Sequence, residues 1–330
     1  MRLVQLSGPL GRRVAVVEEP QLRLLEGPPT VYDLASECLR EGTSLASAIE
    51  RHKSADLLDY DPIYRGESDW RLLPSADFPG EPSRCLVSGT GLTHQASAKN
   101  RDAMHAGTQA VTDSTRMYLS GVEGGKPAPG EAGISPEWFY KGSGAVLRAH
   151  GEPLVVPEFA EDGGEEPEVA GVYIVDLKGT PRRVGFTVGN EFSDHVFERK
   201  NYLYLAASKL RTCSIGPELV IDADFNLIPG EVAVERDGKT LWSHAIKTGE
   251  ATMCHSLANI EHHHFKFDFH RSPGDLHIHF FGADAFSFGA GVQLQDGDVM
   301  QVRFDGFGRA LRNPMTRVSV STKAVEVKPI

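Results

Sequence analysis

The stretch from Glu165 to Lys209 reads EEPEVAGVYIVDLKGTPRRVGFTVGNEFSDHVFERKNYLYLAASK. Two of its carboxylates, Glu166 and Glu168, stand two residues apart at the start of an apolar run. In a strand, both side chains would point to the same face. A third carboxylate, Glu191, follows a second apolar segment. Hard oxygen ligands of this kind suit Mg²⁺, with Mn²⁺ or Ca²⁺ as alternatives, better than zinc. The stretch therefore predicts a divalent-metal site, although a solvated strand face can carry the same pair of glutamates.

Lys209 closes this stretch in the mild context LAASKL. A lysine near a divalent cation can hold an anionic substrate, or it can act as an acid or a base. We therefore expect Lys209 to be a catalytic residue.

Four segments in and after this stretch carry a family resemblance. EPEVAG, GFTVGNEFSDH, ASKL and IGPELV are similar to the ExE, GYTVGND-type, lysine and LGPxxV motifs of the fumarylacetoacetate hydrolase superfamily. In that family the two glutamates and the Asp of the Asn-Asp pair bind a divalent metal. The resemblance thus implies that Glu166, Glu168 and Glu191 are metal ligands, with Glu191 one methylene longer than the family's Asp. His195 stands where the family often has Arg.

The segment CLVSGTGLTH, residues 85–94, resembles the family's strand and glycine-rich turn before a helix. His94 is similar to a family histidine that activates water in the hydrolases, and general base work suits a group that titrates near neutrality. His94 could equally cap the following helix. The pattern GTGLTH…KNRDAMH, together with YLAASKL, is similar to the sugar-acid branch of the family.

Further blocks imply where a substrate is held. EWFYKGSG resembles a family segment in which a Lys and a Ser recur, and PGDLHIHFFGAD…DGD…GFG…RNP resembles the family's C-terminal block. The family's TGTP turn appears here as FGAD, which brings in Asp284, a residue that would repel a carboxylate unless it points away. The resemblance implies these substrate-binding residues: Ser88, Gly89, Thr90, Lys141, Ser143, His195, Phe281 and Gly282.

The resemblance spans residues 82–315 in collinear order and implies an α+β fold. We expect a mixed β-sandwich or β-roll catalytic domain over residues 81–330 and a small α+β module over residues 1–80. Local patterns predict helix from residue 31 to 59 with a break capped at Thr43 or Ser44, and a loop or lid over residues 120–136. They also predict a hairpin with Asp237-Gly238 at its turn.

The resemblance implies Mg²⁺-dependent dehydration of a 2-keto-3-deoxy pentonate to 2,5-dioxopentanoate through an enolate that the metal stabilises. Lys209 and His94 are the candidates for the proton transfers, without an assignment between them. The alternative within the family is hydrolytic carbon–carbon cleavage of a 2,4-diketo-3-deoxy sugar acid, in which His94 would activate water.

Composition limits the other classes of function. The formal net charge of −11 argues against nucleic-acid binding, which needs a basic surface. No apolar run approaches the length of a membrane span. The four cysteines, Cys38, Cys85, Cys213 and Cys254, are widely spaced and suggest reduced thiols in a cytoplasmic protein. The expected partner is a small anionic 2-keto acid, and the family implies a homodimer or a higher homo-oligomer.

Histidines are concentrated near the C-terminus and suggest a competing reading. His277 and His279 alternate in GDLHIHFFG and could face one metal from a strand, as in a cupin-like oxygenase. Scattered surface histidines are the plainer interpretation. The eight histidines between residues 244 and 279 are His244, His255, His262, His263, His264, His270, His277 and His279.

Overall fold

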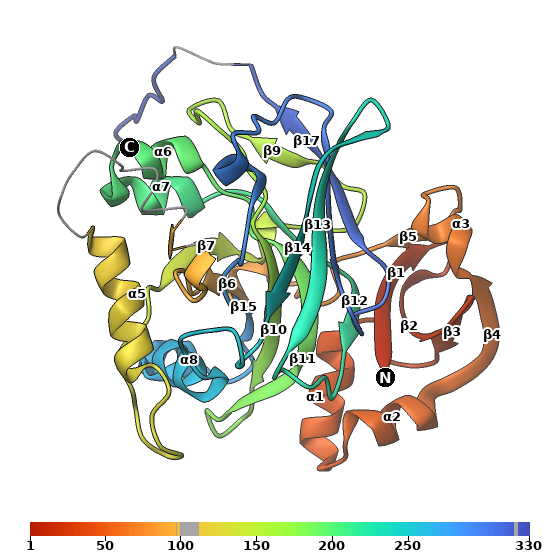
Figure 1. Ribbon diagram of the computed structural model, residues 1–330. Helices are drawn as coiled ribbons and strands as arrows, with labels where there is room; N and C mark the ends of the chain where they lie inside the picture. The colour runs from red at the N-terminus through yellow and green to blue at the C-terminus, as the bar shows by residue number, and fades with distance from the viewer. Residues whose placement is uncertain (97, 100–111, 320–322) are drawn as a thin grey trace.

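The computed structural model describes residues 1–330 apart from residues 97, 100–111 and 320–322. The KNRDAMH motif therefore lies outside the described residues from residue 100 onward. The described chain forms two β-sheets with helices at their sides (Figure 1). The expected α+β class is confirmed.

The larger sheet joins the N-terminal strands to the strands that carry the predicted metal ligands. Because β1 pairs with β12, residues 1–80 share this sheet with the rest of the chain, and a domain boundary near residue 80 stays a prediction. Its strands run in the order β4 (Lys53–Asp59), β3 (Gln21–Leu25), β2 (Gly11–Glu18), β1 (Arg2–Gly8), β12 (Cys213–Val220), β11 (Pro181–Asn190), β10 (Pro167–Val175), β15 (Leu276–Phe280), β6 (Cys85–Gly89) and β7 (Phe139–Ser143), with β5 (Arg71–Leu72) beside β1 and β8 (Leu147–Arg148) beside β12.

The smaller sheet contains the predicted hairpin. Asp237 and Gly238, at its turn, have φ angles of 52° and 72°, which a tight hairpin turn of this type requires. The strand order is β14 (Lys239–Thr248), β13 (Ile228–Arg236), β16 (Val299–Phe304), β17 (Leu311–Arg317) and β9 (Leu154–Val156).

Two of the local predictions need correction. The helix that Ser44 caps ends at His52, because residues 53–59 pair with β3 as strand β4. The predicted loop over residues 120–136 begins inside α5, which continues to Gly124. The α-helices are α1 (Val31–Glu41), α2 (Leu45–His52), α3 (Tyr60–Tyr64), α5 (Asp113–Gly124), α6 (His195–Lys200), α7 (Leu205–Lys209) and α8 (Leu257–Phe265). The short 3₁₀ helices are η1 (Pro82–Arg84), η2 (Gly144–Val146), η3 (Tyr202–Tyr204), η4 (Asp268–Arg271) and η5 (Ser287–Ala290).

Strand β10 lies at the centre of the core, since all of its residues are buried. Ala170, Val172 and Ile174 pack into the apolar cluster that includes helix α1. Val169 and Tyr173 pack into the cluster that includes the smaller sheet. The strand is therefore held from both faces, which fixes its register and the positions of the glutamates at its start.

A buried carboxylate ties the N-terminal strands to the rest of the chain. Glu218, on β12, accepts hydrogen bonds from Arg2 Nη1 at 2.8 Å, Tyr60 OH at 3.2 Å and the Arg309 backbone N–H at 3.0 Å. The Arg309 guanidinium also lies 3.8 Å from the centre of the Tyr60 ring. Three distant segments thus depend on one acceptor.

We predict that Glu218→Ala lowers the free energy of unfolding by about 2–4 kcal/mol, because buried donors lose their acceptor and a cavity remains. Glu231→Ala removes an exposed carboxylate of β13 and should change it by less than about 0.5 kcal/mol. Urea denaturation measures both. Equal midpoints for the two variants would show that the Glu218 contacts do not hold these segments together.

Candidate active site

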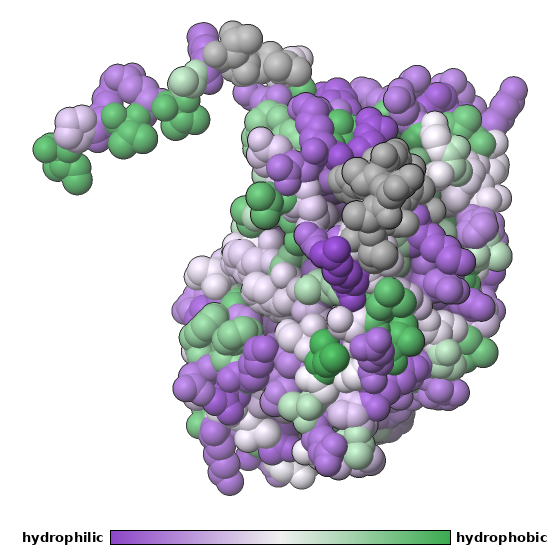
Figure 2. Space-filling view, turned by 60° about the vertical axis from the view of Figure 1, so that its left-hand side comes forward, coloured by the Kyte–Doolittle hydropathy of each residue, from purple (hydrophilic) through white to green (hydrophobic). Residues whose placement is uncertain are grey.

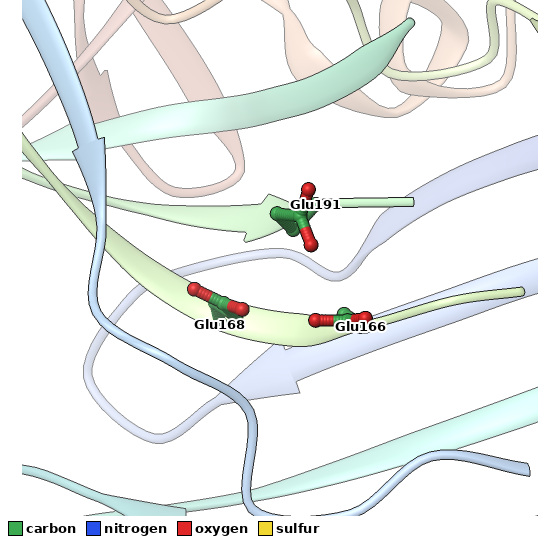
Figure 3. Close-up of side chains that lie close together, drawn as sticks. All are labelled: Glu166, Glu168 and Glu191. Carbon is green, nitrogen blue, oxygen red and sulfur yellow. The ribbon is translucent and has the colours of Figure 1, made fainter. Parts of the chain in front are cut away.

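Three carboxylates meet where β10 begins and β11 ends. These antiparallel strands pair Pro167 with Asn190, so Glu166 and Glu191, the next residue on each strand, lie opposite one another. The Glu191 N–H donates to Glu166 O at 3.0 Å. One ligand oxygen from each of Glu166, Glu168 and Glu191 lies within 4.8 Å of the others, and all three residues are buried (Figure 3). The structure thus brings the three predicted metal ligands together.

Two buried lysines offset the charge of these carboxylates. Lys209 Nζ lies 2.9 Å and 3.0 Å from the Glu166 oxygens and 2.5 Å from Glu191 Oε2. Lys141 Nζ lies 2.6 Å from Glu191 Oε1. Burial lowers the pKa of Lys141, and the nearby Glu191 opposes that shift. Two ammonium groups against three carboxylates leave the cluster with an excess of negative charge.

The excess of negative charge affects the pKa of Glu168. Burial raises its pKa well above the ordinary value, and the charges of Glu191 and Glu166 raise it further. Gly282 N–H, at 2.7 Å from Glu168 Oε2, supplies only a partial positive charge. A divalent cation among hard oxygen ligands would remove the repulsion, so the donor set fits a hard divalent cation.

Helix α6 supports the same cluster from the side. Asp194 caps the helix by accepting the Phe197 N–H, which follows the ordinary preference for Asp at this position. His195 then places Nε2 3.0 Å from Glu166 Oε1, and its ring stacks on Phe286 with centroids 4.5 Å apart. Burial lowers the pKa of His195, but the hydrogen bond with Glu166 and the negative charges of Glu166, Glu198 and Asp162 together outweigh this, and the net shift is upward. His195 thus contacts a predicted metal ligand.

The turn FGAD, residues 281–284, stands where the family has TGTP, and its geometry requires the glycine. Gly282 has φ of +95°, and a Cβ there would lie 2.1 Å from Thr93 Oγ1, so glycine is required. Its N–H reaches Glu168. Asp284 turns to another strand, where Oδ2 accepts the Lys247 N–H at 3.1 Å. The Phe281 ring packs in the core against Phe186 and Phe225, which leaves its predicted contact with substrate without support.

The predicted turn after β6 is held by a histidine. His279 Nδ1 lies 2.8 Å from Ser88 Oγ, and His279 Nε2 lies 2.7 Å from Thr90 Oγ1. Both hydroxyls are therefore engaged behind the turn. Gly89 lies against the ring of Phe139, and the Lys209 ammonium lies 4.7 Å from the centre of that ring.

His94 lies next to this turn but is a weak base. Its Nδ1 is 2.9 Å from Thr93 Oγ1, and Thr93 Oγ1 donates to Phe281 O. Burial lowers the pKa of His94 to about 3, contrary to the expectation of a group that titrates near neutrality. The Ser143 hydroxyl is engaged with the backbone, because it accepts the Ala145 N–H at the start of η2. Its role as a substrate contact stays a prediction.

Glu137 is a buried carboxylate beside the turn after β6 that the sequence analysis did not single out. It is 5% exposed, and a Cβ on Gly91 would lie 2.3 Å from its Oε1, so it lies against the turn after β6. Tyr202 of η3 donates a hydrogen bond to its Oε2. Glu137 is the first residue of the EWFYKGSG segment, two positions before Phe139, but only the tertiary structure brings it beside the turn after β6.

The C-terminal histidines do not form a competing metal centre in the described part of the chain, where the glutamates are the one group with metal-ligand geometry. His264 Nε2 lies 2.9 Å from His277 Nδ1, and His264 Nδ1 accepts from Trp138 Nε1 at 3.2 Å. Burial lowers the pKa of both His277 and His279 to about 3. The surface interpretation is also wrong for six of the eight histidines: His255, His263, His264, His270, His277 and His279 are buried.

Solved structures share the fold of this chain. Two solved structures of 2-keto-3-deoxy-D-arabinonate dehydratase share the fold, the apo form with a TM-score of 0.70 at 20% identity over 96% of this chain and 99% of that one. The form complexed with magnesium and 2,5-dioxopentanoate has a TM-score of 0.69 at 19% identity over 97% of this chain and 100% of that one.

Two curated sequences are similar to this chain. A probable 2-keto-3-deoxyxylonate dehydratase of Haloferax volcanii is 30% identical over 189 residues, which cover 56% of this chain and 61% of that protein. A 2-dehydro-3-deoxy-D-arabinonate dehydratase of Saccharolobus solfataricus is 26% identical over 36% of this chain and 40% of that protein. The match thus spans less than two thirds of either relative. No model of a known protein family matches the sequence. The resemblance to sugar-acid dehydratases is confirmed.

We predict that Glu168→Gln abolishes detectable Mg²⁺ binding in a calorimetric titration, because it removes one of three charged ligands. His277→Ala should leave the Mg²⁺ affinity within about twofold of the unsubstituted protein, a change that is small beside the roughly 10–100-fold effect of a metal-supporting residue. If only the His277→Ala variant lost metal binding, the metal site would have to be formed by the histidines instead of the glutamates.

A pH dependence follows from the raised pKa of Glu168. A carboxylate with a raised folded-state pKa stabilises the fold below its unfolded pKa and loses that contribution as the pH rises through the folded pKa. Glu168 should therefore lower the stability of the metal-free protein at about pH 8 but not at about pH 5. Mg²⁺ should raise the melting temperature more at the higher pH, and Glu168→Gln should remove the difference. An Mg²⁺ effect independent of pH would contradict this.

Proposed function

We propose that this protein is an Mg²⁺-dependent dehydratase that converts a 2-keto-3-deoxy pentonate into 2,5-dioxopentanoate and water. The observation that carries the proposal is the buried cluster of Glu166, Glu168 and Glu191 in contact with Lys209. The similarity to the two curated dehydratases supports the substrate class. A bound Mg²⁺ would act as a Lewis acid that polarises the keto group and makes the carbon-3 proton more acidic.

The chain's own residues then account for substrate binding. The substrate is an anion, and the net charge of −11 would repel it without local positive charge. Lys141 and Lys209 place two ammonium groups at the carboxylate cluster. The turn after β6 and the Gly282 turn lie against each other, because Gly282 contacts Thr90 and Thr93, and together they limit the site on one side.

Two residues are suited to the proton transfers. Dehydration removes a proton from carbon 3 and expels the hydroxyl from carbon 4, which leaves as water after it gains a proton. Loss of a proton from carbon 5 and of its hydroxyl proton, with protonation of carbons 3 and 4, then yields the aldehyde at carbon 5. Lys209 Nζ, next to the carboxylates, and Glu137, against the turn after β6, are the groups we assign to these transfers. Buried His94, with its pKa lowered to about 3, would bind a proton too weakly for either step.

The same observation disfavours the hydrolase. Carbon–carbon hydrolysis of a 2,4-diketo acid needs a base to activate water, and His94 was the residue expected to do so. Its low pKa and its hydrogen bond with Thr93 do not suit that role. We therefore retain the dehydratase. The proposal also includes a cytoplasmic homo-oligomer, which the family resemblance suggests. In the described part of the chain, no helix is long and apolar enough to span a membrane.

We predict that the protein with Mg²⁺ removes one water from a 2-keto-3-deoxypentonate, read by mass spectrometry. Chelation of the metal should stop the reaction. A 2,4-diketo-3-deoxy acid, offered separately, should remain intact. Pyruvate and a hydroxy acid from that second compound would instead establish the hydrolase, and no product from either would reject both.

Glu137→Gln should lower kcat by about 10²–10⁴-fold, the usual contribution of a general acid or base. Its Mg²⁺ affinity should remain nearly unchanged, since Glu137 is not one of the clustered metal ligands. Tyr202→Phe is the matched control, because it removes the hydrogen bond to Glu137 but keeps the carboxylate. A Glu137→Gln enzyme with unchanged kcat would exclude Glu137 from catalysis.

A further inference from the structure

A fourth buried carboxylate lies beside the cluster and has no part in the proposed reaction. Glu198, on helix α6, is fully buried. Its carboxylate lies 3.5 Å from Lys209 Nζ. It was absent from the sequence motifs, since it stands three residues after His195 in an ordinary charged helical segment, HVFERK.

The placement of Glu198 follows from the construction of α6. Residues three apart lie on the same side of a helix, so His195 and Glu198 face the cluster together. His195 reaches Glu166, and Glu198 reaches Lys209. Helix α6 thus contacts both a metal ligand and the lysine that now neutralises it.

Glu198 is held in place by a serine next to the lysine. Ser208 Oγ donates to Glu198 Oε1 at 2.9 Å. The same hydroxyl accepts the Asp194 N–H at 2.9 Å, and Arg211 pairs with Asp194 at 3.3 Å. These contacts connect α6 to the end of α7, where Lys209 is located. The carboxylate therefore has a fixed position relative to the ammonium group.

Lys209 and a metal ion compete for the same oxygens. The ammonium lies within 3.0 Å of both Glu166 oxygens and of Glu191 Oε2, and these two residues also belong to the predicted ligand set. A divalent cation and an ammonium on the same carboxylate edges would repel each other strongly in a buried site. Metal binding therefore requires Lys209 to move, and a buried ammonium needs another anion to accept it.

We propose that Glu198 is a positioning residue that retains the Lys209 ammonium when a divalent cation occupies Glu166, Glu168 and Glu191. With Glu198 already 3.5 Å away, a short displacement exchanges one salt bridge for another and keeps the ammonium beside the substrate position. This inference rests on the proposed function for its metal. It explains why a carboxylate that is not a ligand is buried beside the ligands.

A double-mutant cycle on Mg²⁺ affinity tests the proposal, with calorimetric titration of the full chain. Lys209→Met should tighten Mg²⁺ binding about tenfold, because the competing cation is gone. Glu198→Gln should weaken binding about tenfold, because Lys209 then remains on Glu166 and Glu191. In the Lys209→Met background, Glu198→Gln should have an effect of less than about twofold.

The control is Glu161→Gln, which also removes one charge beside α6. Glu161 pairs with Lys200 at the surface and should leave the affinity unchanged. If Glu198→Gln weakens Mg²⁺ binding by the same factor with and without Lys209, or not at all, the proposal is overturned. Absence of Mg²⁺ binding by the unsubstituted chain would overturn both the metal of the proposed function and this inference. Mg²⁺ binding with an additive cycle would overturn only the inference.

A milder variant covers the case in which Glu198→Gln fails to fold. Ser208→Ala keeps every charge and removes both the hydrogen bond that orients Glu198 and the acceptor of the Asp194 N–H. It should weaken Mg²⁺ binding about threefold, and only when Lys209 is present. An equal effect in the Lys209→Met background would show that Ser208 acts on the fold rather than on the position of Lys209.

Discussion

The burial of three mutually repelling carboxylates is the constraint on which the site depends. Ionised glutamates in a protein interior are costly unless opposite charge lies close by. Here Lys209 and Lys141 supply two charges, and burial together with the charges of Glu191 and Glu166 raises the pKa of Glu168. The same excess that destabilises the metal-free cluster favours a divalent cation. A divalent cation would relieve the repulsion between the carboxylates, and this relief would contribute to its affinity. The surrounding sheet must be rigid enough to keep the carboxylates together.

That rigidity comes from strand β10 and its neighbours. A strand buried on both faces, paired with β11 on one side and β15 on the other, cannot slip by one residue without exposing its apolar side chains. Its register places Glu166 opposite Glu191, and β15 leads directly into the Gly282 turn that binds Glu168. All three carboxylates are thus positioned by strand pairing, whereas both lysines reach the cluster from β7 and α7. The ligands are fixed by the paired strands β10 and β11, whereas Lys141 lies on β7 at the end of the same sheet and Lys209 at the end of helix α7.

Residues whose positions depend on local spacing could be predicted from the sequence, whereas residues brought to the site by long-range contacts could not. The ExE pair could be recognised because a strand has a period of two, and Glu191 because it follows a recognisable motif. Glu137 and Glu198 could not be found this way, since each is brought to the site by tertiary packing rather than by spacing. The helix predicted through residue 59 failed for a related reason: pairing of β4 with β3 overrides the helical periodicity after His52. His94 was placed beside the correct turn, but its basicity was misjudged because the degree of burial cannot be read from the motif.

The histidines show why composition alone does not identify a metal centre. The alternation of His277 and His279 does place them on one strand, as a ligand pair would require. Their nitrogens are directed elsewhere, however: His279 bridges Ser88 and Thr90, and His277 pairs with His264. Burial keeps His277 and His279 neutral by lowering each pKa to about 3, which lets a ring donate from one nitrogen and accept at the other without adding charge to the core. Neutral imidazoles can therefore hold the turn after β6 in place behind the site, while the carboxylates in front concentrate the negative charge that attracts a hard cation.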